Sequence, residues 1–149
     1  MAANTTSNNT AVGFQSLKSN TAGLDNSALG SLALSLNTTG NYNTGLGSYS
    51  LRNNTTGTSN TAVGSLALLC NIGNRNTAVG LFSLRYNTTG YRNTAVGTCS
   101  LRYNVVGRYN TAVGDNALLK NTAIIFYFIS LSFLIENWSK FFQYLFTDE

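Results

Sequence analysis

A short pattern of polar, small and apolar residues, Asn-Thr-Ala-Val-Gly, recurs along most of this chain, either intact or lightly changed. With the Asn of each copy taken as position zero, the copies begin at Asn9, Asn26, Asn43, Asn60, Asn76, Asn93 and Asn110. The spacing is 17 residues, except between Asn60 and Asn76, where it is 16. A fixed period of this kind indicates a repeat architecture, in which each unit buries its apolar residues only by stacking on its neighbours.

The apolar positions of the repeat predict what the unit is. A repeat of 16 or 17 residues is too short for a pair of helices and has no 3.6-residue period, so each repeat is predicted to form one coil of a parallel β-solenoid in an all-β protein. Position three is always branched and apolar, at Val12, Leu29, Leu46, Val63, Val79, Val96 and Val113. Position eight is always Leu, at Leu17, Leu34, Leu51, Leu68, Leu84, Leu101 and Leu118. We therefore predict two short extended segments per coil and two inward apolar columns, with Thr at position one on the same face as position three.

Glycine and asparagine fill the other constant positions. Gly at position four, and a second Gly near position fourteen that ends Asn-Thr-Thr-Gly in the best copies, predict tight bends or close approaches of backbone. Asn also recurs at position eleven, at Asn20, Asn37, Asn54, Asn71, Asn87, Asn104 and Asn121. Stacked coils place equal residues above one another, so we expect amide ladders, and we interpret these Asn residues as structural rather than ligand-binding.

The motif, with the Ser-Leu and Asn-Thr-Thr-Gly that follow it, resembles the head repeats of trimeric autotransporter adhesins and related repeats of phage and giant-virus fibre proteins, over residues 9–120. Ala62, Val63 and Gly64 match the family's Ala-Ile-Gly, whereas Thr61 stands where the family has Val. The repeat here is also longer, in its Asn-Thr-Thr-Gly turn. The resemblance implies a left-handed parallel β-roll in which three chains pack side by side into a fibre head.

The resemblance and the composition together predict a non-enzymatic fibre or adhesin-like segment that forms a homotrimer. Small residues at positions two, four and seven would give a face that lets copies approach closely. The family implies a location outside the cell, at the cell surface or in a virion, although Met1 to Thr10 lack the basic and apolar regions of a secretory signal.

Three regions follow from the pattern: a lead or partial coil over residues 1–8, a seven-coil solenoid over 9–120 and a tail over 121–149. The tail is apolar from Ala123 to Ile135, which is shorter than the roughly 20 residues that span a bilayer, and its remainder has a helix-like pattern. Three interpretations stay open: a helical cap or trimer contact, an interfacial or membrane anchor, and out-of-frame translation of an AT-rich gene.

The charge distribution points to one candidate binding surface. The net charge is +4, and up to Lys120 eight basic residues stand against only Asp25 and Asp115. Position nine holds Lys18, Arg52, Arg85 and Arg102, with Tyr86 and Tyr103 at position ten and Arg92 and Arg108 at the return turn. Basic residues among aromatic rings bind polyanions and stack on sugars, so this set is a candidate stripe for a host-surface glycan or another polyanion. The alternative is an exposed basic surface that serves solubility.

Catalytic and metal chemistry have few residues to use. The chain has no His, and its Cys70 and Cys99 occupy different positions of the repeat, so we expect no disulfide, metal site or cofactor. The two carboxylates of the repeats are five repeats apart, which disfavours a glycosidase-type pair. Ice binding by a flat Thr array is disfavoured because Thr adjoins Asn in the predicted turns. The glycosylation-type triplets at Asn37, Asn54 and Asn87 follow from the turn itself.

Overall fold

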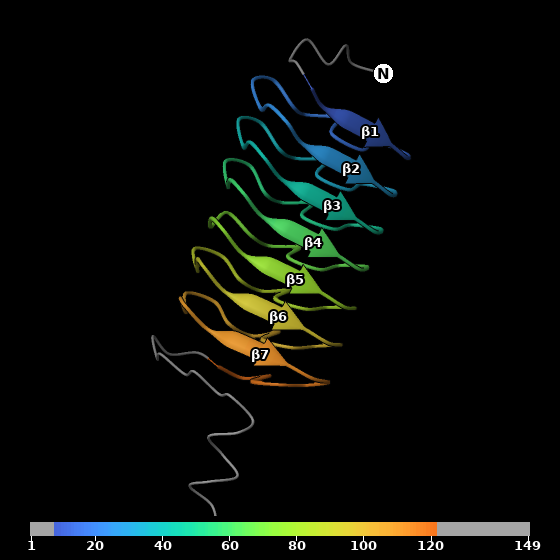
Figure 1. Ribbon diagram of the computed structural model, residues 1–149. Coiled ribbons are helices and arrows are strands. Elements are labelled where there is room, and N and C mark those ends of the chain that lie inside the picture. The colour runs from blue at the N-terminus through green and yellow to red at the C-terminus, as the bar shows by residue number, and fades with distance from the viewer. Residues whose placement is uncertain (1–7, 122–149) are drawn as a thin grey trace, which may run out of the picture.

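The structure, a computed structural model, describes residues 8–121. Seven three-residue strands form one sheet in sequence order: β1 (Thr10–Val12), β2 (Ser27–Leu29), β3 (Thr44–Leu46), β4 (Thr61–Val63), β5 (Thr77–Val79), β6 (Thr94–Val96) and β7 (Thr111–Val113). All neighbouring strands are parallel and in register by repeat position, so Thr61 pairs with Thr77 and Val63 with Val79 even across the 16-residue repeat. Figure 1 shows the strands as a single stack joined by loops. The described residues therefore form the predicted parallel β-solenoid, and they contain no helix.

The predicted lead and tail can be compared with the structure only at their inner ends. Residues 1–7 and 122–149 lie outside the described residues. The three interpretations of the tail therefore stay open.

The inward residue of each strand is position two and not position three. Ala62 and Ala78 are fully buried, whereas Leu29 is 50 % exposed and Leu46 is 40 % exposed. The prediction that the position-three column forms the core is wrong, and Thr at position one faces outward with it. The reason is space: a Cβ added at Gly45, which occupies position two, would already lie 3.0 Å from the Ser50 Oγ and 3.4 Å from the Leu34 Cγ of the preceding coil. The Leu of a coil fills the interior so completely that only a methyl group or hydrogen fits opposite it.

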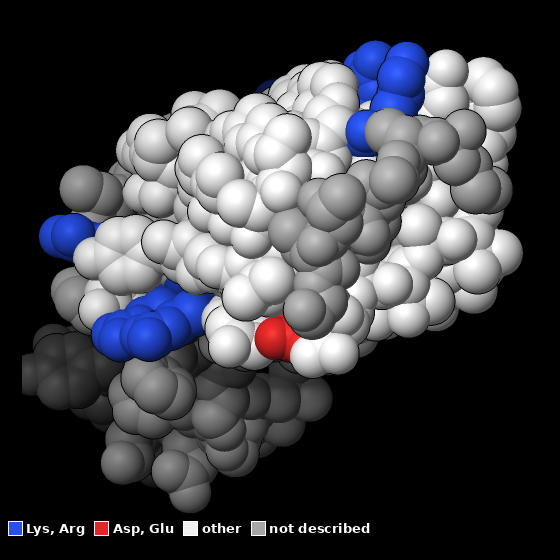
Figure 2. All heavy atoms as spheres, turned by 90° about the horizontal axis from the view of Figure 1, so that it is seen from above, with Lys and Arg blue, Asp and Glu red and all other residues white. Residues whose placement is uncertain are grey.

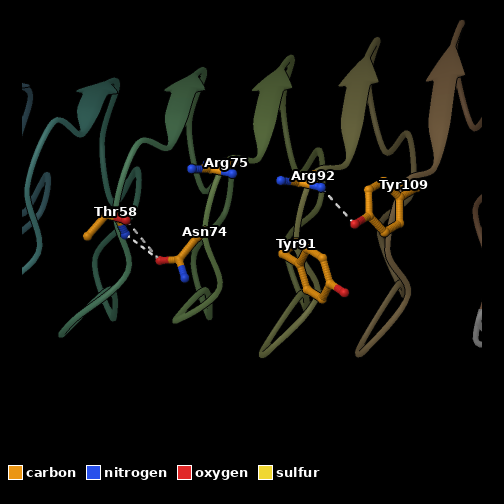
Figure 3. Close-up of a pocket in the computed structure, with 6 residues that line it drawn as sticks. All are labelled: Thr58, Asn74, Arg75, Tyr91, Arg92 and Tyr109. Carbon is orange, nitrogen blue, oxygen red and sulfur yellow. Dashed lines mark hydrogen bonds between the residues drawn. The ribbon is translucent and has the colours of Figure 1, made fainter.

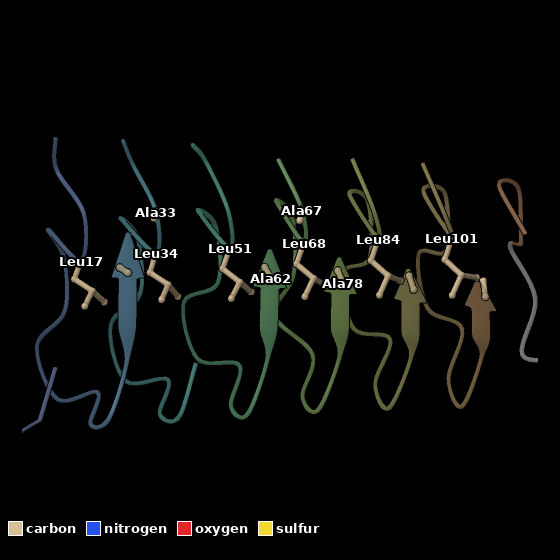
Figure 4. Close-up of a cluster of buried hydrophobic side chains, with 13 residues drawn as sticks. Leu17, Ala33, Leu34, Leu51, Ala62, Ala67, Leu68, Ala78, Leu84 and Leu101 are labelled. Atoms are coloured by element: carbon tan, nitrogen blue, oxygen red, sulfur yellow. The ribbon is translucent and has the colours of Figure 1, made fainter. Parts of the chain in front are cut away.

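The position-eight Leu column is buried as predicted, but its backbone is not extended. Leu68 and its equivalents are enclosed in the stack, and Figure 4 shows them in one column facing the strand alanines. Their φ angles are positive, as are those of position six: Leu68 has φ 51° and Leu66 has φ 59°. A left-handed conformation costs a non-glycine residue about 1–2 kcal/mol. Hydrogen bonds between coils offset this cost, because Leu68 N donates to Ser83 O at 3.0 Å and Leu66 N donates to Ser48 O at 2.9 Å.

The two predicted amide ladders are present and converge on one column of carbonyls. Asn60 is fully buried, and its Nδ2 donates to Asn43 Oδ1 at 3.1 Å and to Gly73 O at 2.8 Å. In the position-eleven ladder, Asn71 Nδ2 donates to Asn54 Oδ1 at 3.0 Å and also to Gly73 O at 2.8 Å. Buried amides are tolerated only when they are hydrogen-bonded, so these ladders allow half of the narrow core to be polar.

Candidate functional site

The outward face of the sheet is the first candidate, and we call it the strand face: positions one and three of all seven strands. Position one holds Thr or Ser and position three holds Val or Leu, so the face has no charged residue. Its branched side chains are exposed at Leu29, Leu46 and Val96 (36 %) and half-buried at Val63 and Val79 in the middle of the stack. Strict register gives one column of hydroxyl groups beside one apolar column. The argument against a flat Thr array is therefore wrong, since this Thr column lies on the sheet and not in the turns.

A second candidate is the position-nine cluster, which we define as Arg85, Arg102, Phe82, Tyr86 and Tyr103. The Tyr86 and Tyr103 rings are stacked, with centroids 5.2 Å apart and planes at 12°. The Arg102 guanidinium carbon lies 5.0 Å from the Phe82 centroid and 5.2 Å from that of Tyr103, and the Arg85 carbon lies 5.0 Å from both Phe82 and Tyr86. Both arginines thus already have aromatic partners.

The side chains around Arg102 favour its charged form. Burial alone would lower the pKa of its guanidinium, but the charge interaction with Tyr103 and the hydrogen bond with the Tyr86 side chain leave that pKa above its ordinary value. The Nε atoms of Arg85 and Arg102 are buried and have no hydrogen-bond partner within residues 8–121.

The third candidate is the turn-edge cluster, formed by Tyr91, Arg92, Arg108 and Tyr109 from two successive return turns. Each arginine donates to the tyrosine of the other coil: Arg92 Nη1 to Tyr109 Oη at 2.7 Å, and Arg108 Nη1 to Tyr91 Oη at 3.0 Å. The two rings meet edge to face, with centroids 5.4 Å apart. These crossed pairs hold the basic and aromatic side chains at fixed positions on the edge.

The predicted stripe is therefore divided in the structure. Arg85, Arg102, Tyr86 and Tyr103 come together, whereas Arg92 and Arg108 belong to the turn-edge cluster, beyond the turn that begins at position eleven. Arg52 has its own partner, with its guanidinium carbon 5.7 Å from the Tyr49 centroid. Two uncharged residues, Ser35 and Leu69, occupy position nine on either side of Arg52, so the basic column is interrupted. Figure 2 accordingly shows Lys and Arg in separate groups around the stack. Binding of a glycan or polyanion there stays a prediction.

A cavity of about 290 Å³ lies on the turn edge, beside the turn-edge cluster. It is lined by Thr58, Asn74, Arg75, Tyr91, Arg92 and Tyr109, which come from four successive return turns (Figure 3). Asn74 and Arg75 are exposed and belong to the 16-residue repeat. Sequence reasoning did not single out these two residues, because the residue before position zero varies among the repeats, as Asp25, Tyr42 and Ser59 show. The available signal was that Arg75 and Arg92 both directly precede position zero, in successive repeats.

Other chemistry has little basis in the described residues. Residues 8–121 contain no group of three or more His, Cys, Asp or Glu side chains that could hold a metal ion. Cys70 and Cys99 are free thiols. Among the described residues there is no helix long and apolar enough to cross a membrane.

The fold defines the class: within its described residues the chain is a β-solenoid repeat protein with coils of 16 or 17 residues. In comparisons with known proteins, the chain matches no family model, no curated protein and no solved structure. Function must therefore be argued from its own surfaces.

Proposed function

We propose that this protein is a non-enzymatic, structural segment of a fibre at a cell surface or on a virion, and that it forms a homotrimer through the strand face. The observation that carries this proposal is the outward-facing position-three column, which is exposed at Leu29, Leu46 and Val96 and half-buried at Val63 and Val79. Every repeat has Val or Leu at a position that the core does not use. A contiguous, uncharged apolar surface on a soluble protein marks an interaction site.

The contact face differs from the one expected from the small residues. Positions two and seven lie inside the coil, as fully buried Ala62 and Ser50 show, so they are not available to another copy. The strand face takes their place. It is straight and in register over seven coils, so a copy of the same rod can meet it along its whole length. The resemblance to adhesin heads with three side-by-side chains supports three copies rather than two.

The test is a pair of variants with the same change in charge. Leu46→Lys combined with Val96→Lys would place a column of like charges in the contact, whereas Thr56→Lys combined with Thr39→Lys adds the same charge at exposed positions of the return turns. We expect the first pair to lower the mass of the folded protein in size-exclusion chromatography with light scattering, and the second pair to leave it unchanged. Circular dichroism of both variant pairs serves as the control that they stay folded.

Two results would refute this proposal. Equal masses for both variant pairs would mean that the strand face makes no contact between copies. Thermal hysteresis in the wild-type protein would show that the strand face meets ice, because a face buried between copies is not free to do so.

A further inference from the structure

The cavity on the turn edge is formed by side chains held at a regular spacing. Its three residues that directly precede position zero, Arg75, Arg92 and Tyr109, all have left-handed backbones, with φ between 54° and 57°. Hydrogen bonds to the coil before fix each of them: Arg75 N donates to Thr58 O at 3.0 Å and Arg92 N donates to Asn74 O at 3.0 Å. The two arginines therefore begin one coil apart, about 4.8 Å. The stack therefore fixes the backbone positions from which these side chains project.

The polar atoms that face the cavity are mainly donors. The Asn74 Oδ1 accepts hydrogen bonds from Thr58 N at 2.7 Å and Thr58 Oγ1 at 3.2 Å, which fixes the amide and leaves its Nδ2 as a donor on the other side (Figure 3). Arg92 uses Nη1 toward the Tyr109 hydroxyl, and the rest of its five-donor guanidinium stays available. Arg75 is exposed, and no carboxylate lines the cavity.

This donor set calls for an anionic group. Asp25 and Asp115 are the carboxylates of the described residues, and neither lines the cavity. Arg75 and Arg92 both line this cavity from adjacent coils, and guanidinium groups bind carboxylates and sulfates with charge-assisted hydrogen bonds. The Tyr91 ring, held by Arg108, adds an aromatic wall beside them.

The size and shape of the cavity favour a sugar over a nucleic acid. A volume of about 290 Å³ is near the lower end for small-ligand sites and suits one ring with its substituents. The Tyr91 and Tyr109 rings meet at 72°, so they do not form the series of parallel platforms on which successive bases of a single strand stack.

We propose that the turn-edge cavity binds one acidic sugar residue of a glycan, with its carboxylate or sulfate between Arg75 and Arg92 and its ring against Tyr91. This inference goes beyond the proposed fibre function, and it uses residues of the return turns rather than those of the strand face. A fibre segment built in this way would present one such site on each copy.

The experiment is isothermal titration calorimetry of the full chain at physiological salt. Four ligands are titrated separately: 3′-sialyllactose, a sulfated heparin tetrasaccharide, neutral lactose and a thymidine oligonucleotide. We expect the sialylated or the sulfated saccharide to bind and lactose not to bind. Which of the two acidic saccharides binds shows whether the site takes a carboxylate or a sulfate. Arg75→Gln should weaken that binding by about tenfold or more, which is the loss of one charge-assisted contact. Lys120→Gln, the matched control with the same charge change at an exposed position outside both the cavity and the predicted stripe, should stay within about twofold of wild type.

Three results would overturn the inference: neither acidic saccharide binds, both variants weaken binding equally, or the oligonucleotide binds more tightly than both saccharides. Ligand-induced shifts of the Tyr91 and Tyr109 ring signals in wild-type protein provide a second readout that needs no variant. Light scattering on the same samples separates this proposal from self-association. Arg75→Gln should leave the mass unchanged, and the Leu46→Lys, Val96→Lys variant should still bind the saccharide.

Discussion

Replacing the position-four glycine by alanine tests whether the coils are as closely stacked as the structure indicates. At Gly64, φ is 129°, and an added Cβ would lie 2.7 Å from Gly80 O in the next coil. At Gly114, in the last coil, φ is 127°, but the nearest atom to an added Cβ is the Ala117 Cβ at 3.9 Å. The two positions have nearly the same φ, and within residues 8–121 they differ in that a further coil lies above Gly64 and none lies above Gly114.

The expected magnitudes follow from these two terms. An unusual φ costs an L residue about 1–3 kcal/mol, so Gly114→Ala should lower the free energy of unfolding by that amount. Gly64→Ala has the same term and an additional overpacking cost of about 1–3 kcal/mol. The Ala Cβ is fixed by the backbone and its neighbour is the Gly80 carbonyl, so no rotation of a side chain relieves the contact. The Gly64→Ala variant should therefore be the less stable of the two by at least about 1 kcal/mol.

Urea unfolding of both full-length variants, followed by far-ultraviolet circular dichroism, gives the comparison. The dependence of the free energy of unfolding on urea concentration, measured on the wild-type protein, converts the two midpoints into free energies. If Gly64→Ala and Gly114→Ala lose equal stability, the close approach of coils is not the reason for glycine at position four, and the packing described above is incorrect.

Two further predictions concern the amide ladder and the left-handed turns. Asn60→Asp replaces two buried donors by a carboxylate that faces Asn43 Oδ1 and Gly73 O, so it should cost about 3 kcal/mol or more at pH 7, whereas the half-buried Asn53→Asp should cost little. Burial raises the pKa of the new carboxyl above its unfolded value of about 3.9, so the loss of stability should shrink as the pH falls through the raised pKa. Urea unfolding at pH 7 and pH 4 measures this change. A loss of stability that does not depend on pH would contradict this account. Ser59 is exposed with φ 57°, so Ser59→Gly should leave stability unchanged or raise it by up to about 1 kcal/mol. Thr56→Gly, at an exposed position outside the left-handed set, should lower stability by about 0.5–1 kcal/mol, and thermal melts that rank the two variants in reverse would argue against strain at Ser59.

The period of the sequence was sufficient to predict the fold, because a parallel stack puts equal positions above one another. The Asn ladders and the buried Leu column followed from the same reasoning. The direction of each strand did not follow, since three residues such as Thr61, Ala62 and Val63 allow either the middle or the outer pair to face inward. The hydrophobicity of Val favoured the wrong choice. The better signal was size: position two is always Ala or Gly, and an invariably small residue fits opposite an invariable Leu.

The left-handed backbone at position six and the turn-edge cavity could not be predicted from the sequence, for a different reason. Position six holds residues as different as Gln15, Phe82 and Cys99, and none of them signals a left-handed backbone. From the second coil onward, each position-six N–H donates to the coil before it, as Phe82 N donates to Ser65 O at 3.1 Å, and this hydrogen bond is a property of the stack. The cavity arises likewise from variable residues such as Arg75 and Tyr91, which only the assembled turns bring together.

The mass of the wild-type protein in solution tests the central proposal most directly. Light scattering across a range of concentrations should give about three times the 16.0 kDa of one chain for a folded, β-rich sample. The strand face would then be covered, and the turn edge would remain open to a ligand. A folded sample that stays at 16.0 kDa at every concentration would contradict the proposal that copies associate through the strand face.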